Sequence, residues 1–167
     1  AHLRRLDQAA ALVPALLQVL DVRDVFTRLS TTARQALPHD FLLLRLFSDD
    51  YSQITVYAST DTGVATHAVA NAYPPAMIDA WSFDIVDDLR SHPYEASQPT
   101  VKMGAQSSLR VPIRIDGRVV GGVALLSRTP AAFSTADVPI ARRLAEYVAV
   151  GLSHHRLAEE RRVAAAL

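Results

Sequence analysis

The sequence predicts an α+β fold in which helices at both ends of the chain pack on an antiparallel sheet. Three observations predict it. Apolar residues recur at helical spacing before residue 38 and again after residue 134, and hairpin-linked strand patterns lie between them. The terminal helices would cover one face of the sheet. The irregular residues 60–106 would cover the other face, where a pocket could form.

Length and composition suit one domain with its own core. Half of the 167 residues are hydrophobic, and a chain of this size buries roughly 70% of its unfolded surface. The 17 basic and 17 acidic residues balance, which argues against a direct nucleic-acid binder. Cysteine is absent, which excludes disulfides, thiolate nucleophiles and thioether-linked cofactors. No apolar run approaches the ~20 residues that cross a bilayer, and no signal peptide is visible, so we expect a cytoplasmic protein without membrane insertion.

The N-terminal region predicts two helices. The first, over residues 1–20, has one apolar face at spacings typical of a helix, and Pro14 should kink it. The second begins at an N-cap, Asp21, and ends at Pro38. The apolar face of the first is formed by Leu3, Leu6, Ala10, Val13, Leu17 and Leu20, and that of the second by Val22, Val25, Phe26, Leu29, Ala33 and Leu37.

Two hairpins are predicted. Residues 41–47 form a strand buried on both faces except at Arg45, and residues 54–58 return as its partner after a polar turn. Residues 109–115 alternate apolar and polar, and Asp116-Gly117 is a strong signal for a two-residue type I′ turn into residues 118–126. Within that last strand, Gly121 and Gly122 indicate a bulge or a close backbone approach.

Residues 60–106 have the least regular pattern. Pro74 and Pro75 could open a short helix through Trp81, and Phe83, Ile85 and Val86 suggest a short strand. The segments around His92-Pro93 and Gln98-Pro99 are typical of loops. A stretch of this length with so little pattern is often a functional lid or binding loop.

The C-terminal region predicts one long helix. Phe133 forms a hydrophobic staple with Val138, and Ser134 with Asp137 forms a capping box. A helix over residues 135–165 is about 46 Å long. Beyond residue 152 the large apolar residues thin out, so we expect that end to pack against a partner helix. Because the chain starts with Ala and ends in a helical pattern, we interpret it as part of a longer protein.

The sequence predicts no enzyme and no metal site. It contains no G-x-S-x-G elbow, no P-loop and no dinucleotide fingerprint. His154, His155 and Glu159 lie on one helix, but the H-E-x-x-H zinc motif is missing, and neither histidine has the sequence context of a kinase phosphoacceptor. A solvated helix face explains these residues better than a metal does.

Residues suited to a ligand pocket lie on the strands and in the irregular middle. Arginines in apolar strands require an anionic partner, which is either Asp87 or Asp88 or a bound anionic ligand. Aromatic residues there, Tyr73 among them, either wall a pocket or simply pack in the core, and His67 and His92 are either pocket residues or exposed loop residues. The candidate pocket residues are Arg45, Tyr57, Trp81, Phe83, Asp87, Arg110 and Arg114, and Asp84 with Asp87 and Asp88 forms an acidic cluster that a turn explains equally well.

The chain resembles a GAF domain over nearly its whole length. The residues that carry the resemblance are Leu20-Asp-Val-Arg-Asp-Val25, Ala36-Leu-Pro-His-Asp-Phe41, Ile85-Val-Asp-Asp-Leu89, Ser108 through Gly122, Phe133-Ser-Thr-Ala-Asp137 and Ala145 through Glu160. Each motif is weak alone, and their order and spacing make the set specific. The chain is most similar to bacterial GAF domains that precede sensor kinase modules or the AAA+ domains of transcription activators.

The resemblance implies a sheet of five or six strands, terminal helices on one face and a small-molecule pocket on the other. It also implies a homodimer through the terminal helices, with Leu3, Leu6, Leu17, Leu152, Leu157 and Val163 as the candidate contacts. Without cysteine the chain lacks the covalent bilin site of phytochromes and the thiols of free methionine sulfoxide reductases. The cyclic-nucleotide signature Asn-Lys-Phe-Asp-Glu is also missing, so no covalent cofactor is expected and the ligand stays open.

Two functions follow as hypotheses for a single domain with an N-terminal helix (1–20), a core (21–152) and an exit helix (153–167). The first is a cytosolic sensor that binds a small molecule and signals to a kinase or transcription activator. The alternative is a ligand-free dimerisation or spacer module. Charge segregation bears on the first: residues 51–100 carry six acids and one base, and residues 101–128 five bases and one acid. This favours pairing between the irregular middle and the sheet, with an anionic ligand as the competitor for the arginines.

Overall fold

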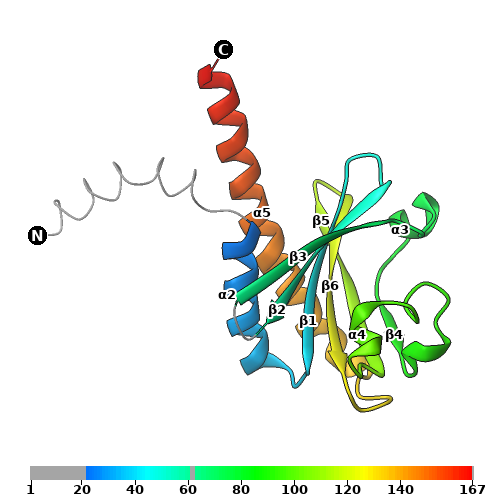
Figure 1. The fold of residues 1–167 in the computed structure, drawn as a ribbon. Coiled ribbons are helices and arrows are strands. Elements are labelled where there is room, and N and C mark those ends of the chain that lie inside the picture. The colour runs from blue at the N-terminus through cyan, green and yellow to red at the C-terminus, as the bar shows by residue number, and fades with distance from the viewer. Residues whose placement is uncertain (1–21, 61–62, 167) are drawn as a thin grey trace, which may run out of the picture.

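The computed structural model describes residues 22–60 and 63–166 and shows an open six-stranded antiparallel sheet (Figure 1). The strand order is β3-β2-β1-β6-β5-β4. The predicted helix over residues 1–20 and its leucines, and the Asp21 cap, lie outside the described residues. The elements are α2 (Val22–Ala36), β1 (Phe41–Phe47), β2 (Gln53–Thr60), β3 (Gly63–Ala70), α3 (Pro75–Asp79), β4 (Asp84–Val86), α4 (Pro99–Lys102), β5 (Ser107–Ile115), β6 (Arg118–Ser127) and α5 (Val138–Ala166).

The two long helices α2 and α5 cover one face of the sheet, as expected (Figure 1). Successive side chains of a strand point to opposite faces, so Leu42 and Leu44 of β1 pack in the main core beneath the helices. Leu43 belongs to a second, smaller apolar cluster on the other face. That second face is covered by residues 71–106, which we call the lid segment, and it is the face that carries the site.

The edge strand β3 was not expected, because residues 60–106 carry no strand pattern at their start. β3 pairs with β2 from Gln53↔Ala70 to Thr60↔Gly63. Nearly all of its residues are exposed or half-buried, and most are small or polar. An edge strand that buries neither face has no apolar alternation by which the sequence could reveal it.

The β5–β6 hairpin confirms the predicted type I′ turn, since Asp116 and Gly117 have φ angles of 52° and 78°. Both expectations for the glycine pair are also met. The register of β5 against β6 shifts after the Ile113↔Gly121 pair to Arg114↔Val119, which leaves Val120 as a bulge next to Gly121. A Cβ added to Gly121 would lie 2.1 Å from the carbonyl oxygen of Arg45 on β1.

The lid segment is more ordered than the sequence predicts. The helix opened by Pro75 ends at Asp79, so Trp81 follows α3 instead of closing it. The predicted strand is present as β4, and a 3₁₀ turn spans Leu89–Ser91. Gln98, expected in a loop, is the N-cap of the short helix α4. Leu89 and Ala105 anchor the segment in the second apolar cluster.

Helix α5 confirms the predicted capping box and extends for 29 residues, about 44 Å. The backbone N–H of Ser134 donates to the Asp137 carboxylate at 2.9 Å. The first half of α5 packs on β5 and α2, and its C-terminal end projects away from the sheet (Figure 1). Among the described helices, none is long and apolar enough to cross a membrane.

Candidate ligand-binding site

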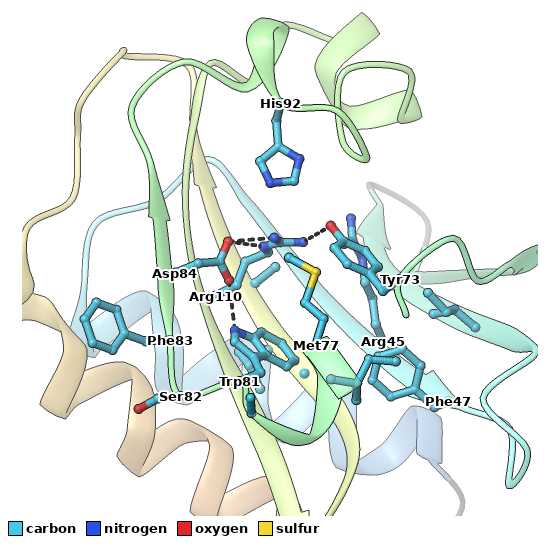
Figure 2. A pocket seen from close by; sticks show the side chains of 16 residues that line it. Arg45, Phe47, Tyr73, Met77, Trp81, Ser82, Phe83, Asp84, His92 and Arg110 are labelled. Carbon is cyan, nitrogen blue, oxygen red and sulfur yellow. Dashed lines mark hydrogen bonds and ion pairs between the residues drawn. The ribbon is translucent and has the colours of Figure 1, made fainter. Parts of the chain in front are cut away.

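A cavity of about 430 Å³ lies between the lid face of the sheet and the lid segment. Its floor comes from β1 and β6, and its walls come from the stretch between Tyr73 and His92 (Figure 2). The volume lies within the range of about 300–1,000 Å³ that small-molecule sites occupy. The lining residues are Arg45, Phe47, Ile54, Tyr73, Met77, Ile78, Ala80, Trp81, Ser82, Phe83, Asp84, His92, Arg110, Gly122, Val123 and Ala124.

Trp81 sits directly on the sheet because Gly122 leaves room for it. A Cβ at Gly122 would lie 2.3 Å from Cη2 of the Trp81 ring. The indole Nε1–H donates to Oδ1 of Asp84 at 3.0 Å, and Arg114 donates to the Trp81 carbonyl oxygen at 2.8 Å. Gly122, the second glycine of the predicted pair, is therefore the position on β6 against which the Trp81 ring packs.

Two arginines, two carboxylates and a tyrosine form one hydrogen-bonded group beside the cavity, which we call the ion cluster: Arg45, Tyr73, Asp84, Glu95 and Arg110. Alternation along β1 and β5 points Arg45 and Arg110 to the lid face. Arg45 forms a two-pronged pair with Glu95, with Nη1–Oε1 and Nη2–Oε2 distances of 2.6 and 2.9 Å.

Arg110 links the two carboxylates of the cluster. Its Nε and Nη2 both donate to Oδ2 of Asp84, at 2.9 and 2.6 Å, and its Nη1 donates to the Tyr73 hydroxyl (Figure 2). The same Nη1 also donates to Glu95. Tyr73 in turn donates its hydroxyl proton to Glu95 at 2.6 Å. With Asp84 directly opposite Arg110 in the β4–β5 register, the cluster joins β1, β5, β4 and the lid segment.

Burial and charge together set the protonation of the cluster. The side chains of Glu95 and Arg110 are only 4% and 9% exposed. Burial alone would raise the pKa of Glu95, but hydrogen bonds and charges from Arg45 and Arg110 outweigh it and lower that pKa to about 2. Burial raises the pKa of Tyr73 well above its usual value. Two positive and two negative side chains therefore face each other, and the cluster carries no net charge.

The low pKa of Glu95 predicts a loss of stability in acid. In the unfolded chain the carboxyl titrates near its ordinary 4.5, and in the folded protein near 2, so its stabilising contribution is complete above about pH 4.5 and is lost as the pH falls toward 2. Between about pH 6 and pH 3, urea unfolding should show that the wild type loses about 2 kcal/mol more than Glu95→Gln. Equal losses in the two proteins would contradict this assignment.

Four of the seven predicted pocket residues line the cavity: Arg45, Trp81, Phe83 and Arg110. The other three do not. Tyr57 packs in the main core on the helix side, because its position in β2 alternates away from the lid face. Asp87 follows β4 and is exposed, and its carbonyl oxygen accepts from Ala131. Arg114 is exposed and reaches the cavity only through the carbonyl of Trp81.

The expected acidic partners of the arginines were wrong, although they lie in the expected part of the chain. Asp88 pairs with Arg90 at the surface, and Asp84 and Glu95 occupy the cluster. Glu95 was not recognised from the sequence. One signal could have found it: it is the sole acidic residue between positions 89 and 106.

His92, one of the two loop histidines considered, lines the cavity opposite Arg110 (Figure 2). Its Nδ1 accepts the backbone N–H of Tyr94 at 3.2 Å. Burial, and then the positive charge of Arg110, lower its pKa. The ring is therefore neutral at neutral pH, and its proton is on Nε2. The other histidine, His67, lies on the exposed edge strand β3.

The predicted dimer residues of α5 fall in two environments. Leu152 is 8% exposed and belongs to the main core, whereas Leu157 and Val163 are 53% and 56% exposed. The expectation that the chain's own core cannot bury the last turns agrees with this exposure. Across the described ranges, no group of three or more potential metal ligands comes together, His154 and His155 included.

The comparisons identify the family. The family model described as GAF domain matches residues 19–153, and the chain therefore belongs to the GAF domain family. GAF domains are sensory signalling domains, found in sensor kinases and in other proteins. None of the curated proteins compared with the sequence matches it significantly.

Solved structures share the fold at low sequence identity. A domain of a two-component sensor histidine kinase protein from Sinorhizobium meliloti is 16% identical, with a TM-score of 0.64 over 84% of this chain and 97% of that one. A free methionine-R-sulfoxide reductase from Neisseria meningitidis, in complex with its substrate, is 20% identical, with a TM-score of 0.58 over 88% and 89%. The chromophore-binding domain of a bacteriophytochrome from R. palustris is 17% identical, with a TM-score of 0.61 over 93% and 62%. The fold thus occurs in enzymes as well as in sensors.

Proposed function

We propose that this GAF domain is a cytosolic sensor module that binds a small molecule in the cavity beside Trp81 and transmits the change through α5 to an output domain, either a kinase or a transcription activator. The observation that carries the proposal is the cavity itself, whose walls are largely apolar and whose one polar end is built mainly from the paired groups of the ion cluster. We infer a binding role instead of a catalytic one, because the chain has no cysteine and both arginines of the cavity are bound to carboxylates.

A physical link between the cavity and α5 supports the signalling part of the proposal. Arg110 of β5 faces the cavity, while its neighbours Leu109 and Val111 point to the opposite face and pack in the core shared with α5. A ligand that shifts β5 by changing the ion cluster changes the surface on which α5 rests. The free energy with which the ligand shifts the domain between two arrangements of β5 and α5 would equal the difference between its binding free energies for those two arrangements.

A thermal-shift screen with a set of metabolites tests this function. A ligand at about one hundred times its dissociation constant adds about 2.7 kcal/mol to the free energy of unfolding, which raises the melting temperature of a domain of this size by about 5–10 °C. Ala124→Leu, which extends a side chain from β6 into the cavity, should abolish the shift. Ala68→Leu on the exposed edge strand β3 is the matched control and should retain it. A broad set that never shifts the wild type would contradict the proposal.

A second function, dimerisation without a ligand, is favoured by the exposed apolar face of α5. Tyr147, Val150 and Leu157 are 42%, 58% and 53% exposed, and their spacings of three and seven residues place them on one side of the helix. We propose that this side pairs with the same helix of a second copy, with Val163 near the end of the contact.

Truncation tests the dimer. A chain that ends at Ser153 lacks Leu157 and Val163, and we expect it to sediment as a monomer under conditions where the full chain sediments as a dimer. The main core ends near Leu152, so the shortened chain should keep its circular dichroism spectrum in proportion to its length. A truncated chain whose sedimentation still shows a dimer would contradict the proposed contact.

A further inference from the structure

The charge balance of the ion cluster restricts which ligand the cavity can accept. Among the described residues, Arg45 and Arg110 are the only cationic side chains that line the cavity, and both are already bonded to carboxylates. An anionic ligand would have to displace Glu95 or Asp84 from them, or leave its own charge uncompensated. Either costs several kcal/mol in a buried site.

A cationic ligand meets the opposite difficulty. In the part of the chain that the structure describes, Asp84 is the one carboxylate that lines the cavity, and Arg110 is bound to its Oδ2 through two nitrogens. A second cation at Asp84 would lie beside a buried guanidinium that is 9% exposed. Like charges at such short range in a poorly solvated site repel strongly.

We propose that the cavity selects an uncharged, mostly apolar molecule with one polar end that both donates and accepts a hydrogen bond. This inference rests on the proposed function and assigns the chemical class of the ligand. The apolar part would contact the side chains that form most of the wall: Phe47, Ile54, Met77, Ile78 and Trp81. It replaces the anionic ligand that the arginines suggested from sequence alone.

The polar end of the ligand has a specific complement in Asp84 and His92. A carboxylate offers about four acceptor positions, and within the described residues Asp84 uses three, two for Arg110 and one for Trp81. Its side chain is 29% exposed, toward the cavity. His92 accepts at Nδ1, and no described residue bonds its Nε2, so a donor remains there. Both side chains face the same space (Figure 2), which suits an amide or lactam group.

Trp81 provides the readout, because it is the single tryptophan of the chain and lines the cavity. Its indole N–H gives one resolved signal in a ¹⁵N-correlation spectrum of the full chain. Three phenylpropyl probes, 3-phenylpropanamide, 3-phenylpropanoate and 3-phenylpropylamine, differ at neutral pH in the charge of the polar end and in the hydrogen bonds that it can make, since only the amide both donates and accepts. We expect a saturable shift of this signal with the amide, and dissociation constants at least tenfold weaker for the carboxylate and the ammonium compound.

A charge-altering variant tests the cause of the selectivity. Asp84→Asn keeps the shape of the side chain and leaves the cluster with one excess positive charge, so the carboxylate probe should gain at least tenfold relative to the amide. Asp87→Asn, three residues along and outside the cavity, is the matched control and should keep the wild-type order. If Asp84→Asn does not fold, the dissociation constants of the three probes for the wild type test the proposal by themselves.

Three results would overturn the proposal. The first is a charged probe that binds the wild type as tightly as the amide. The second is an Asp84→Asn variant that folds and keeps the wild-type order. The third is an indole signal that none of the three probes shifts at millimolar concentration. None of these results refutes the sensor function, which fails only if the broader metabolite set also leaves the melting temperature unchanged.

Discussion

Replacing Glu95 with alanine is expected to lower the free energy of unfolding by about 3–5 kcal/mol. Glu95 accepts hydrogen bonds from Arg45, Arg110 and Tyr73, and its side chain is only 4% exposed. Its removal takes away the carboxylate that binds Arg45 and leaves Asp84, which binds Arg110, as the one carboxylate of the ion cluster. Urea unfolding at neutral pH, followed by circular dichroism, measures the change.

A surface carboxylate provides the control for this experiment. Glu159 pairs with Arg162 on α5 at 2.6 Å, but these side chains are 44% and 61% exposed. Glu159→Ala should change the free energy of unfolding by no more than about 0.5 kcal/mol, since solvent screens an exposed pair. A Glu95→Ala protein that loses no more than this control would show that the buried cluster does not hold the lid segment to the sheet.

Replacing Gly121 with alanine is expected to cost about 3 kcal/mol or more. The added Cβ would lie 2.1 Å from the carbonyl oxygen of Arg45, a backbone atom of the neighbouring strand β1. Because that atom cannot rotate aside, β1 and β6 must separate or shift their register. Chemical unfolding of the variant measures the cost.

The adjacent glycine is the matched control. A Cβ at Gly122 would meet the ring of Trp81, a side chain that can move. Gly122→Ala should therefore lower the free energy of unfolding by less than Gly121→Ala does. It should also change the fluorescence emission of Trp81 more than Gly121→Ala does. Equal losses of stability with unchanged emission would contradict the packing of the indole ring on Gly122.

The regular parts of the fold could be predicted from the sequence because their signals are local. The turn at Asp116-Gly117 requires a positive φ at both residues. Few residue pairs adopt this conformation readily, and Asp-Gly is one of them. The start of helix α5 is predicted by the capping box that Ser134 and Asp137 form. β3 could not be predicted, because an exposed edge strand has no apolar face and its position depends on β2.

The site could be predicted only in part, because its pairings are long-range. Alternation along β1 and β5 was sufficient to single out Arg45 and Arg110 as unusual residues that need anionic partners. Their partner Glu95 lies 50 residues from Arg45 and 15 from Arg110, in a segment without periodicity. Its isolation from other acidic residues is the one local signal, and that signal does not show which carboxylate reaches the arginines. Only the folded lid segment decides between Glu95, Asp87 and Asp88.

The segregation of acidic and basic residues along the chain acquires a specific meaning from the ion cluster. The acidic middle and the basic strand pair do meet, through Asp84 and Glu95 on one side and Arg110 on the other. Since these groups pair with each other, the arginines join the lid segment to the sheet, and on our proposal they are not available to an anion. The rest of the cavity wall is mostly apolar, and this is why we propose an uncharged, mostly apolar ligand.

The most direct test of the sensor account is to titrate the wild type and Ala124→Leu with the compounds that raise the melting temperature, while the Trp81 indole N–H signal is observed. The account predicts saturable shifts in the wild type, dissociation constants that agree with the thermal stabilisation, and no shift in the filled variant. Compounds that stabilise the protein but leave the Trp81 signal unmoved, or that shift it equally in Ala124→Leu, would contradict the assignment of this cavity as the sensory site.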